Sequence, residues 1–328
     1  MRAAVIGLGL GAAHAEAYDA SDEVTSIALC DTNEDSAQKL ATSLSKPVTC
    51  YARLDDLFAS GAVDVVSIVT PDQFHVPHAE AAVAKGAHVL LTKPIATDLD
   101  GARRVIEGAA AANVRLMVAQ ERRLRPRYRR VKELITSGAL GDLIYLRLQA
   151  YQNAQKKFER APWYASKEAG RTAITGSGIH QVDLVRHLGG EVKSVRALGN
   201  KVGPIEFHHY KTIVALFELE SEAVGEVAFT YEATPKLGGD DVTIIGSKGS
   251  VAGDRFVTRD GAEETLPTHD DDMRAGSRAC VRAFLEAIRS GGPVPVTGED
   301  AYASLAAAMA ADRACETGGV VTPEGLRA

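Results

Sequence analysis

One lysine in this sequence is placed where it could take part in proton transfer. Lys93 follows a short apolar run and precedes Pro94. A proline disfavours helix at the residue before it, so the pattern predicts an extended Lys93 at the tip of a strand. A positive charge next to Lys93 would lower the pKa of its ammonium group. The side chain would then relay protons more readily. Taken alone, such a lysine is also typical of a solvated surface charge.

A second group of polar side chains lies on a predicted helix over residues 178–188. His180, Asp183 and His187 fall within about 60° of one another on one helix face, at about 100° per residue. Apolar neighbours indicate that this face is partly buried, so the polar groups need partners inside the protein. Histidine suits general acid–base chemistry at neutral pH. The alternatives are a structural hydrogen-bond cluster or a metal site; without a clear fourth ligand, we predict no metal.

A glycine-rich segment near the N-terminus has the pattern of a dinucleotide-binding turn. Gly7, Gly9 and Ala12 fit G-x-G-x-x-A between a predicted strand and a predicted helix. The helix N-terminus would offer N–H groups to phosphates. The same stretch resembles a signal peptide, but its three glycines each cost about 1 kcal/mol in a helix, which favours the turn. The predicted cofactor-binding residues here are Gly7, Leu8, Gly9, Leu10 and Gly11.

An acidic residue ends the next predicted strand. Asp31 would accept hydrogen bonds from the adenosine ribose hydroxyls and would repel a 2′-phosphate. No lysine or arginine follows until Lys39. The sequence therefore favours NAD over NADP as cofactor.

The elements that must position these residues differ between the two halves of the chain. Residues 1–120 alternate short apolar runs with helical patterns, which predicts an α/β Rossmann domain with a doubly wound parallel sheet. Strands are expected over 2–6, 24–30, 63–69, 87–91 and 115–119, and helices over 11–20, 34–44, 54–60, 75–85 and 99–112. The ends of strands 63–69 and 87–91 carry Thr70 and Lys93 to the carboxyl edge of the sheet, where ligands bind in such folds.

Residues 121–328 predict an α+β domain with an open, mostly antiparallel sheet for substrate binding and oligomerisation. Longer strands are expected over 142–151, 192–199, 211–219, 224–231, 242–246 and 250–258, with a hairpin turn at 246–249. Two helices, 277–289 and 298–317, close the chain and pack back on the body. The irregular stretch 152–171 is a candidate lid or pocket wall.

Composition excludes several classes of protein. The chain has 328 residues, 45% hydrophobic and 24% charged, as in globular proteins of about two domains. Its net charge of −6 gives no basic field for nucleic acid, and no apolar run approaches the roughly 18 residues of a membrane span. Four widely spaced cysteines show no zinc spacing, so we expect reduced thiols in a cytoplasmic protein.

Five segments, in this order and spacing, resemble the Gfo/Idh/MocA oxidoreductases over nearly the whole chain. They are the turn at 7–14, Thr70-Pro71, Thr92-Lys93-Pro94, the arginine-rich 122–126, and the helix with Gly178, Asp183 and His187. The resemblance implies a Rossmann domain followed by an open sheet whose outer face builds homodimers or homotetramers. It also implies hydride transfer between NAD and a secondary alcohol or ketone of a sugar, sugar derivative or cyclitol.

The resemblance also implies roles for single residues. Lys93 would hydrogen-bond the reacting oxygen, His187 would be the general base, and Asp183 would orient His187 or a substrate hydroxyl. Further cofactor contacts are expected from Thr70, Pro71, His75, Thr92, Lys93, Pro94 and Gln120. Substrate contacts are expected from Lys93, Arg123, Tyr151, Asn153, His180, Asp183 and His187. The other arginines of the run 122–130 are expected on a solvated helix face.

The sequence departs from the family pattern at three places. Thr92 replaces a glutamate beside Lys93, Arg171-Thr172 replace a glycine-rich turn, and Gly176 replaces an aspartate. Two other functions remain open: a non-catalytic NAD-binding regulator, and an NAD-dependent sugar hydrolase or lyase that oxidises its substrate transiently. A reductase acting on a keto sugar would use the same residues.

Overall fold

The chain folds into two compact units. The computed structural model describes residues 1–61, 63–269 and 272–323. Unit 1 comprises Met1–Glu121 and Asp272–Ala301, and unit 2 comprises Arg122–Asp271 and Tyr302–Ala328. Among the described residues, every helix is too short or too polar to cross a membrane.

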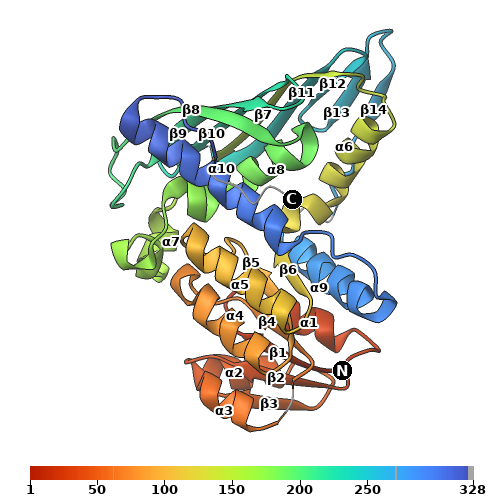
Figure 1. The fold of residues 1–328 in the computed structure, drawn as a ribbon, viewed down its shortest axis with the longest axis vertical. Coiled ribbons are helices and arrows are strands. Elements are labelled where there is room, and N and C mark those ends of the chain that lie inside the picture. The colour runs from red at the N-terminus through yellow and green to blue at the C-terminus, as the bar shows by residue number, and fades with distance from the viewer. Residues whose placement is uncertain (62, 270–271, 324–328) are drawn as a thin grey trace. The chain divides into compact units, whose positions relative to one another are not determined.

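Unit 1 is built on a parallel sheet (Figure 1). Its described strands run in the order β3-β2-β1-β4-β5-β6, and every adjacent pair is parallel. The strands are β1 (Arg2–Ile6), β2 (Ser26–Cys30), β3 (Val48–Tyr51), β4 (Val65–Ile68), β5 (His88–Thr92) and β6 (Leu116–Ala119). This order is that of a Rossmann fold, whose ligands bind where the strand order reverses, between β1 and β4. The predicted strands are thus present, and β3 is an additional strand that the short run Val48–Tyr51 did not reveal.

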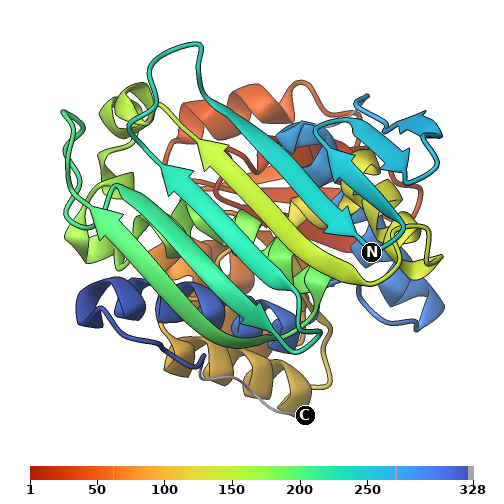
Figure 2. The same ribbon diagram turned by 90° about the horizontal axis from the view of Figure 1, so that it is seen from above.

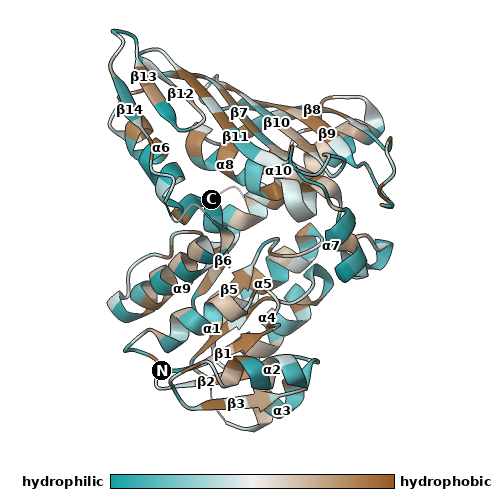
Figure 3. Cartoon of the chain, turned by 180° about the vertical axis from the view of Figure 1, so that it is seen from behind, coloured by the Kyte–Doolittle hydropathy of each residue, from teal (hydrophilic) through white to brown (hydrophobic). Residues whose placement is uncertain are grey.

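Helices connect these strands in unit 1. The helices are α1 (Ala12–Asp19), α2 (Glu34–Ala41), α3 (Leu54–Ala59), α4 (His75–Ala84), α5 (Leu99–Ala111) and α9 (Met273–Ser290), with a 3-10 turn, η1 (Asp72–Phe74). The central strands β1 and β4 are mostly apolar and buried, whereas α2 and α3 carry hydrophilic residues (Figure 3). A sheet buried on both faces forms in this way from short apolar runs between amphipathic helices.

The two units differ from the predicted domains in one segment near the C-terminal end. The sequence placed residues 121–328 together, but Asp272–Ala301 belongs to unit 1. The reason is that α9 packs along α1 with its apolar stripe, in which Cys280 and Phe284 are fully buried. An amphipathic helix does not reveal in its own sequence which surface it will cover.

Unit 2 contains a longer, mostly antiparallel sheet (Figure 2). Among its described residues the strands run in the order β14-β13-β12-β11-β7-β10-β9-β8. They are β7 (Leu143–Tyr151), β8 (Val192–Asn200), β9 (Thr212–Leu219), β10 (Val224–Thr230), β11 (Gly239–Gly246), β12 (Gly249–Ala252), β13 (Arg255–Thr258) and β14 (Glu263–Thr265). The pair β7–β10 is parallel, which is why the sheet is only mostly antiparallel.

Two predicted features of unit 2 differ in detail. The expected single strand over 250–258 is two strands, β12 and β13, because Gly253 at φ +60° turns the chain back between them. The stretch expected to be irregular contains α7 (Gln155–Arg160) and two 3-10 turns, η3 (Pro162–Tyr164) and η4 (Lys167–Ala169). The predicted hairpin between Gly246 and Gly249 is present.

The two faces of the unit 2 sheet have different surroundings. Helix α8 (Ile179–Gly189) packs on the face formed by alternate buried residues such as Leu146, Val227 and Phe217. Figure 2 looks onto the opposite face, where Leu198 is 80% exposed and Leu216 is also exposed. The remaining helices of this unit are α6 (Pro126–Thr136) and α10 (Gly298–Thr317), which begins in unit 1.

Candidate functional site

The glycine turn after β1 is shaped by three positions that a side chain would disturb differently. Gly7 has φ +86°, and a Cβ there would lie 2.5 Å from the carbonyl oxygen of Val69. At Gly11 a Cβ would lie 2.0 Å from the carbonyl oxygen of Gly7. Gly9 is different, because a Cβ there would meet nothing within 4 Å. Gly7 and Gly11 therefore close the turn, and Gly9 leaves its backbone open to a close-lying ligand such as a pyrophosphate.

The helix that follows this turn is anchored by a buried polar cluster. Nδ1 of His14 lies 3.0 Å from Oγ of Ser67, and the Tyr18 hydroxyl lies 2.8 Å from the same oxygen. Burial lowers the pKa of His14 to about 4, so the ring is neutral at pH 7. This cluster joins α1 to β4. The glycine motif does not predict it, because Ser67 lies about 50 residues away in the sequence.

Asp31 lies across the turn, as a ribose-binding carboxylate requires. Its Oδ2 accepts from the backbone N–H of Leu8 at 2.7 Å, and its Oδ1 accepts from that of Asn33 at 2.8 Å. Asp31 is half-buried, so its oxygens retain lone pairs for an outside donor. The two bonds fix the carboxylate beside the glycine turn.

Two loops at the carboxyl edge of the sheet carry Thr70 and Lys93, and His75 joins them. The fully buried ring has Nδ1 at 2.6 Å from the Pro94 carbonyl oxygen and Nε2 at 2.9 Å from that of Thr70. Burial lowers the pKa of His75. The sequence predicts His75 as a cofactor contact; in the structure its ring nitrogens face these two backbone carbonyls, so the ring connects the two loops.

Lys93 is half-buried directly after β5, as its position before Pro94 predicts, and the peptide bond between them is cis. Beside it, Thr92 Oγ1 donates to the Ile68 carbonyl at 3.0 Å. The hydroxyl therefore ties β5 to β4, which is a bond that a glutamate at this position could not donate.

Gln120, directly after β6, has a buried side-chain amide that bears on whether a cofactor fits here. Its side chain is 1% exposed, and neither Oε1 nor Nε2 has a hydrogen-bond partner in the described part of the chain. A buried amide without partners is costly unless a ligand supplies them. The open turn at Gly9, the Asp31 carboxylate and this amide together fit an NAD molecule, with its phosphates, ribose and an amide-bearing ring.

In unit 2, α8 holds the predicted polar stripe. His180 is 9% exposed, Asp183 is 1% exposed and His187 is half-buried, as the apolar neighbours on the helix predict. The helix continues directly from a π-helical turn, η5 (Ile174–Gly178). The Lys132 ammonium donates to the His187 carbonyl at 2.5 Å and so holds the last turn.

Asp183 is paired with the arginine that the sequence predicts as a substrate contact. Arg123 donates from Nε to Oδ2 and from Nη2 to Oδ1, both at 2.7 Å, and both side chains are buried. Such a two-point fork is the strongest common ion-pair geometry. Arg123 therefore acts on Asp183 directly, and Asp183 has a partner that is not a histidine.

The other arginines near Arg123 correct a prediction. The sequence expects a solvated helix face, but Arg122 and Arg125 are 6% and 8% exposed. Arg122 lies in the short 3-10 turn η2 (Glu121–Leu124) before α6, and it pairs with Asp240 at 2.9 Å. Arg122 is inside because Asp240, on the distant strand β11, reaches it, which no local pattern reveals.

Two predicted substrate contacts lie elsewhere in unit 2. Tyr151 alternates with Leu148 and Ala150 along β7, so its ring lies on the sheet face opposite α8, where its hydroxyl donates to Gln149. Asn153 donates from Nδ2 to the Ala233 carbonyl at 2.7 Å. The structure therefore does not bring Tyr151 together with the polar stripe of α8.

Two departures from the family pattern turn out to be one exchange. The Arg171 guanidinium is buried against Gly176, where a Cβ would lie 2.3 Å from its Nε. The same guanidinium lies 4.7 Å from the centre of the Tyr164 ring and 5.2 Å from that of Trp163. An aspartate at position 176 would need the volume that Arg171 fills.

A buried carboxyl supports the start of the π-helical turn. Asp312 accepts from the Thr172 hydroxyl at 2.6 Å, and its other oxygen lies 3.7 Å from Nδ1 of His209. Burial raises the pKa of Asp312 to about 7, and the Glu316 charge adds to this effect. The carboxyl is thus partly protonated near neutral pH.

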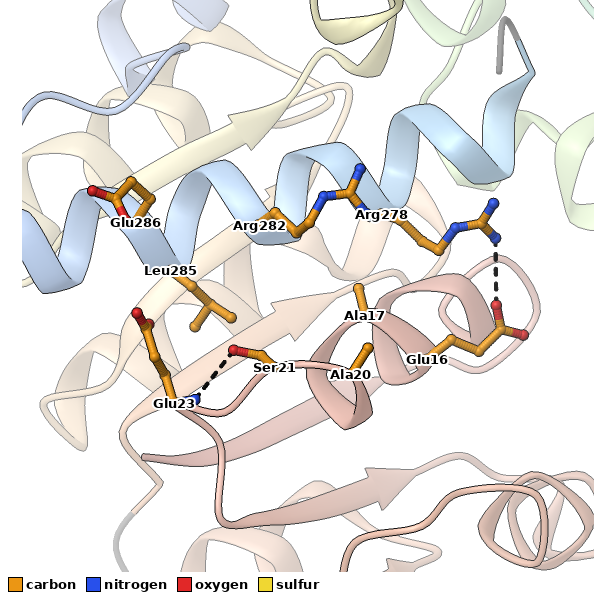
Figure 4. Close-up of a pocket in the computed structure, with 9 residues that line it drawn as sticks. All are labelled: Glu16, Ala17, Ala20, Ser21, Glu23, Arg278, Arg282, Leu285 and Glu286. Atoms are coloured by element: carbon orange, nitrogen blue, oxygen red, sulfur yellow. Dashed lines mark hydrogen bonds and ion pairs between the residues drawn. The ribbon is translucent and has the colours of Figure 1, made fainter. Parts of the chain in front are cut away.

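A separate cavity of about 210 Å³ lies between α1 and α9 in unit 1 (Figure 4). Its lining mixes carboxylates and guanidinium groups, with Glu16 paired to Arg278 at 3.5 Å, and it contains none of the predicted site residues. Over the described ranges, no three His, Cys, Asp or Glu side chains are grouped to hold a metal ion.

Comparison with known proteins places both units. Residues 1–120 match the family model described as the oxidoreductase family with an NAD-binding Rossmann fold, and residues 128–252 match the GFO/IDH/MocA C-terminal domain. The chain is 26% identical to the myo-inositol 2-dehydrogenase of Thermotoga maritima, with 96% of each chain covered. It is 25% identical to the inositol 2-dehydrogenase of Rhizobium meliloti, covering 95% of this chain and 96% of that one.

Solved structures agree in fold. The WlbA dehydrogenase of Bordetella pertussis, in complex with NADH and UDP-GlcNAcA, superposes with a TM-score of 0.84 at 25% identity, covering 100% of this chain and 98% of that one. An oxidoreductase from Agrobacterium radiobacter, in complex with NAD+, L-tartaric acid and magnesium, has a TM-score of 0.87 at 22% identity over 98% of each chain.

Proposed function

Because the chain belongs to the Gfo/Idh/MocA family of NAD-binding oxidoreductases, we propose that it oxidises a secondary alcohol of a sugar, sugar derivative or cyclitol. The observation that carries the proposal is the buried polar stripe of α8, with His180 and Asp183 on one face and His187 beside them. Relatives named as inositol dehydrogenases support the substrate class.

The proposed chemistry divides among three side chains. Bound NAD would supply the hydride acceptor for the carbinol carbon. His187 takes the hydroxyl proton in the oxidation direction, and Lys93 donates a hydrogen bond to the reacting oxygen and stabilises its developing negative charge. Asp183, held by Arg123, accepts a hydrogen bond from a second substrate hydroxyl. Asp31 and Gln120 would hold the cofactor, and the Asp31 carboxylate would favour NAD over NADP.

The test begins with a panel of sugars and cyclitols, offered with NAD or NADP and read as absorbance of the reduced cofactor. We expect steady net reduction of NAD, which a hydrolase or lyase with transient oxidation does not give. His187→Ala and Lys93→Ala should each lower kcat/KM by about 10²- to 10⁴-fold. The matched controls His269→Ala and Lys85→Ala change exposed residues and should leave it unchanged. Full turnover by either site variant would refute its assigned role.

We further propose that copies of the chain associate through the sheet face opposite α8. Leu198, Val214, Leu216 and Val224 are exposed there, and Leu198 and Val214 are direct cross-strand neighbours; exposed apolar side chains on one sheet face support an interface at this place. Light scattering should report a dimer or tetramer, and Leu216→Glu should shift it toward monomer. A monomeric wild-type protein would refute the proposal.

A further inference from the structure

Besides the two hydrogen bonds from Arg123, the Asp183 carboxylate accepts a third hydrogen bond from another side chain. Ser304, on α10 and fully buried, donates from Oγ to Oδ1 at 2.8 Å. Oδ1 therefore accepts two bonds, one from Arg123 Nη2 and one from Ser304, whereas Oδ2 accepts one from Arg123 Nε. A carboxylate offers about two acceptor positions on each oxygen, so these bonds leave one on Oδ2.

The direction of the Ser304 hydroxyl follows from its second partner. Nη1 of Arg186 lies 2.8 Å from Ser304 Oγ. A guanidinium has only donors, so Ser304 must accept from Arg186 and must point its single hydrogen at Asp183. Arg186 thus fixes which way the serine hydrogen bond runs.

Arg186 is itself held by a carboxylate at the end of α8. It donates from Nε and Nη2 to the two oxygens of Glu191, at 3.1 and 2.5 Å. Gly190, with φ +103°, turns the chain so that Glu191 reaches back to the helix. Arg186 is 6% exposed, and this fork satisfies a charge that would otherwise be costly to bury.

We propose that Ser304 is a positioning residue for Asp183, and that Arg186 sets the direction of its hydrogen bond. Arg123 alone holds the carboxylate from one side, and Ser304 prevents it from turning, so that the remaining acceptor position of Oδ2 keeps one direction. The inference rests on the proposed function, in which a substrate hydroxyl donates to that position. It assigns a role to α10, which no site motif in the sequence contains.

The kinetic test compares three variants with the substrate that the panel identifies. Ser304→Ala removes a hydrogen bond to a charged group and should lower kcat/KM for the alcohol by about 10- to 100-fold, with KM for NAD unchanged. Ser304→Thr keeps the donor and should retain most of the activity. Ser221→Ala is the matched control, because the Ser221 hydroxyl donates at 2.8 Å to the Gly189 carbonyl, at the end of the helix α8 that carries Asp183. A Ser304→Ala enzyme as active as the Ser221→Ala enzyme would overturn the proposal. So would a rise of about 10- to 100-fold in the KM of Ser304→Ala for NAD.

A crystallographic comparison tests the same inference without a substrate. In Ser304→Ala the Asp183 carboxylate should turn, moving Oδ1 by more than about 0.5 Å from its wild-type place while Arg123 stays paired. A carboxylate that superposes on the wild type would overturn the positioning role. If the wild type oxidises nothing in the panel, the proposed function fails, and this comparison still decides whether Ser304 orients Asp183.

Discussion

The candidate residues of unit 1 and unit 2 are held in place by different kinds of bond. In unit 1 the backbone does most of the positioning: Asp31 accepts from two backbone N–H groups, and His75 lies between two backbone carbonyls. In unit 2 side chains position one another, because the Asp183 carboxylate accepts from the side chains of Arg123 and Ser304. A backbone-built site tolerates side-chain changes, whereas a side-chain network is sensitive to the loss of any member.

The largest expected effect is the loss of the Asp183 carboxylate. Asp183→Ala removes the buried carboxylate that Arg123 binds at two points and should lower the free energy of unfolding by about 3–5 kcal/mol. Urea unfolding measures the change. The double variant Arg123→Met/Asp183→Leu removes both charges and should regain most of the loss. An Asp183→Ala protein as stable as wild type would mean that side chains do not hold this part of unit 2.

The next effect depends on pH and concerns Asp312. Its pKa is raised by burial from 3.8 to about 7, so the folded protein binds this proton more tightly than the unfolded chain does. Stability attributed to Asp312 is therefore complete below pH 3.8 and is lost as pH rises to about 7. Relative to wild type, the free energy of unfolding of Asp312→Asn should rise across this interval by at most about 4 kcal/mol. Above the interval the difference should stay constant. Urea unfolding at several pH values tests this, with exposed Asp254→Asn as control; a pH-independent difference would contradict it.

Two glycine substitutions in unit 1 should separate folding from cofactor binding. Gly7→Ala places Cβ against Val69 at φ +86° and should cost about 1–3 kcal/mol in stability. Gly9→Ala meets nothing within 4 Å and should leave stability unchanged while weakening NAD binding. Thermal unfolding and NADH fluorescence titration measure the two effects. Equal loss of stability in both variants would refute the separation.

The smallest expected effect on stability is that of Asp31→Ala. Its two backbone donors are partly exposed and can turn to water, so the free energy of unfolding should change by less than about 1 kcal/mol. NAD affinity should fall about tenfold or more, and the preference for NAD over NADP should shrink. Titration with both cofactors gives the ratio. An unchanged preference would remove the specificity argument for NAD.

The sequence by itself determined the parts of this protein that depend on local chemistry. Gly7 shapes a turn through its positive φ, Lys93 follows directly after β5, and period-3.6 spacing puts His180 and Asp183 on one helix face. Each of these signals acts over a few neighbouring residues, and each is present in the structure.

Only the tertiary structure decided which side chains meet. Arg123 pairs with Asp183 across 60 residues and Ser304 reaches it across 121, α9 joins unit 1, and Arg171 fills the space that Gly176 leaves. The physical reason is that a buried charge must find a partner wherever packing brings one. Composition and periodicity indicate that a polar group is buried, but only the folded chain selects the group that satisfies it.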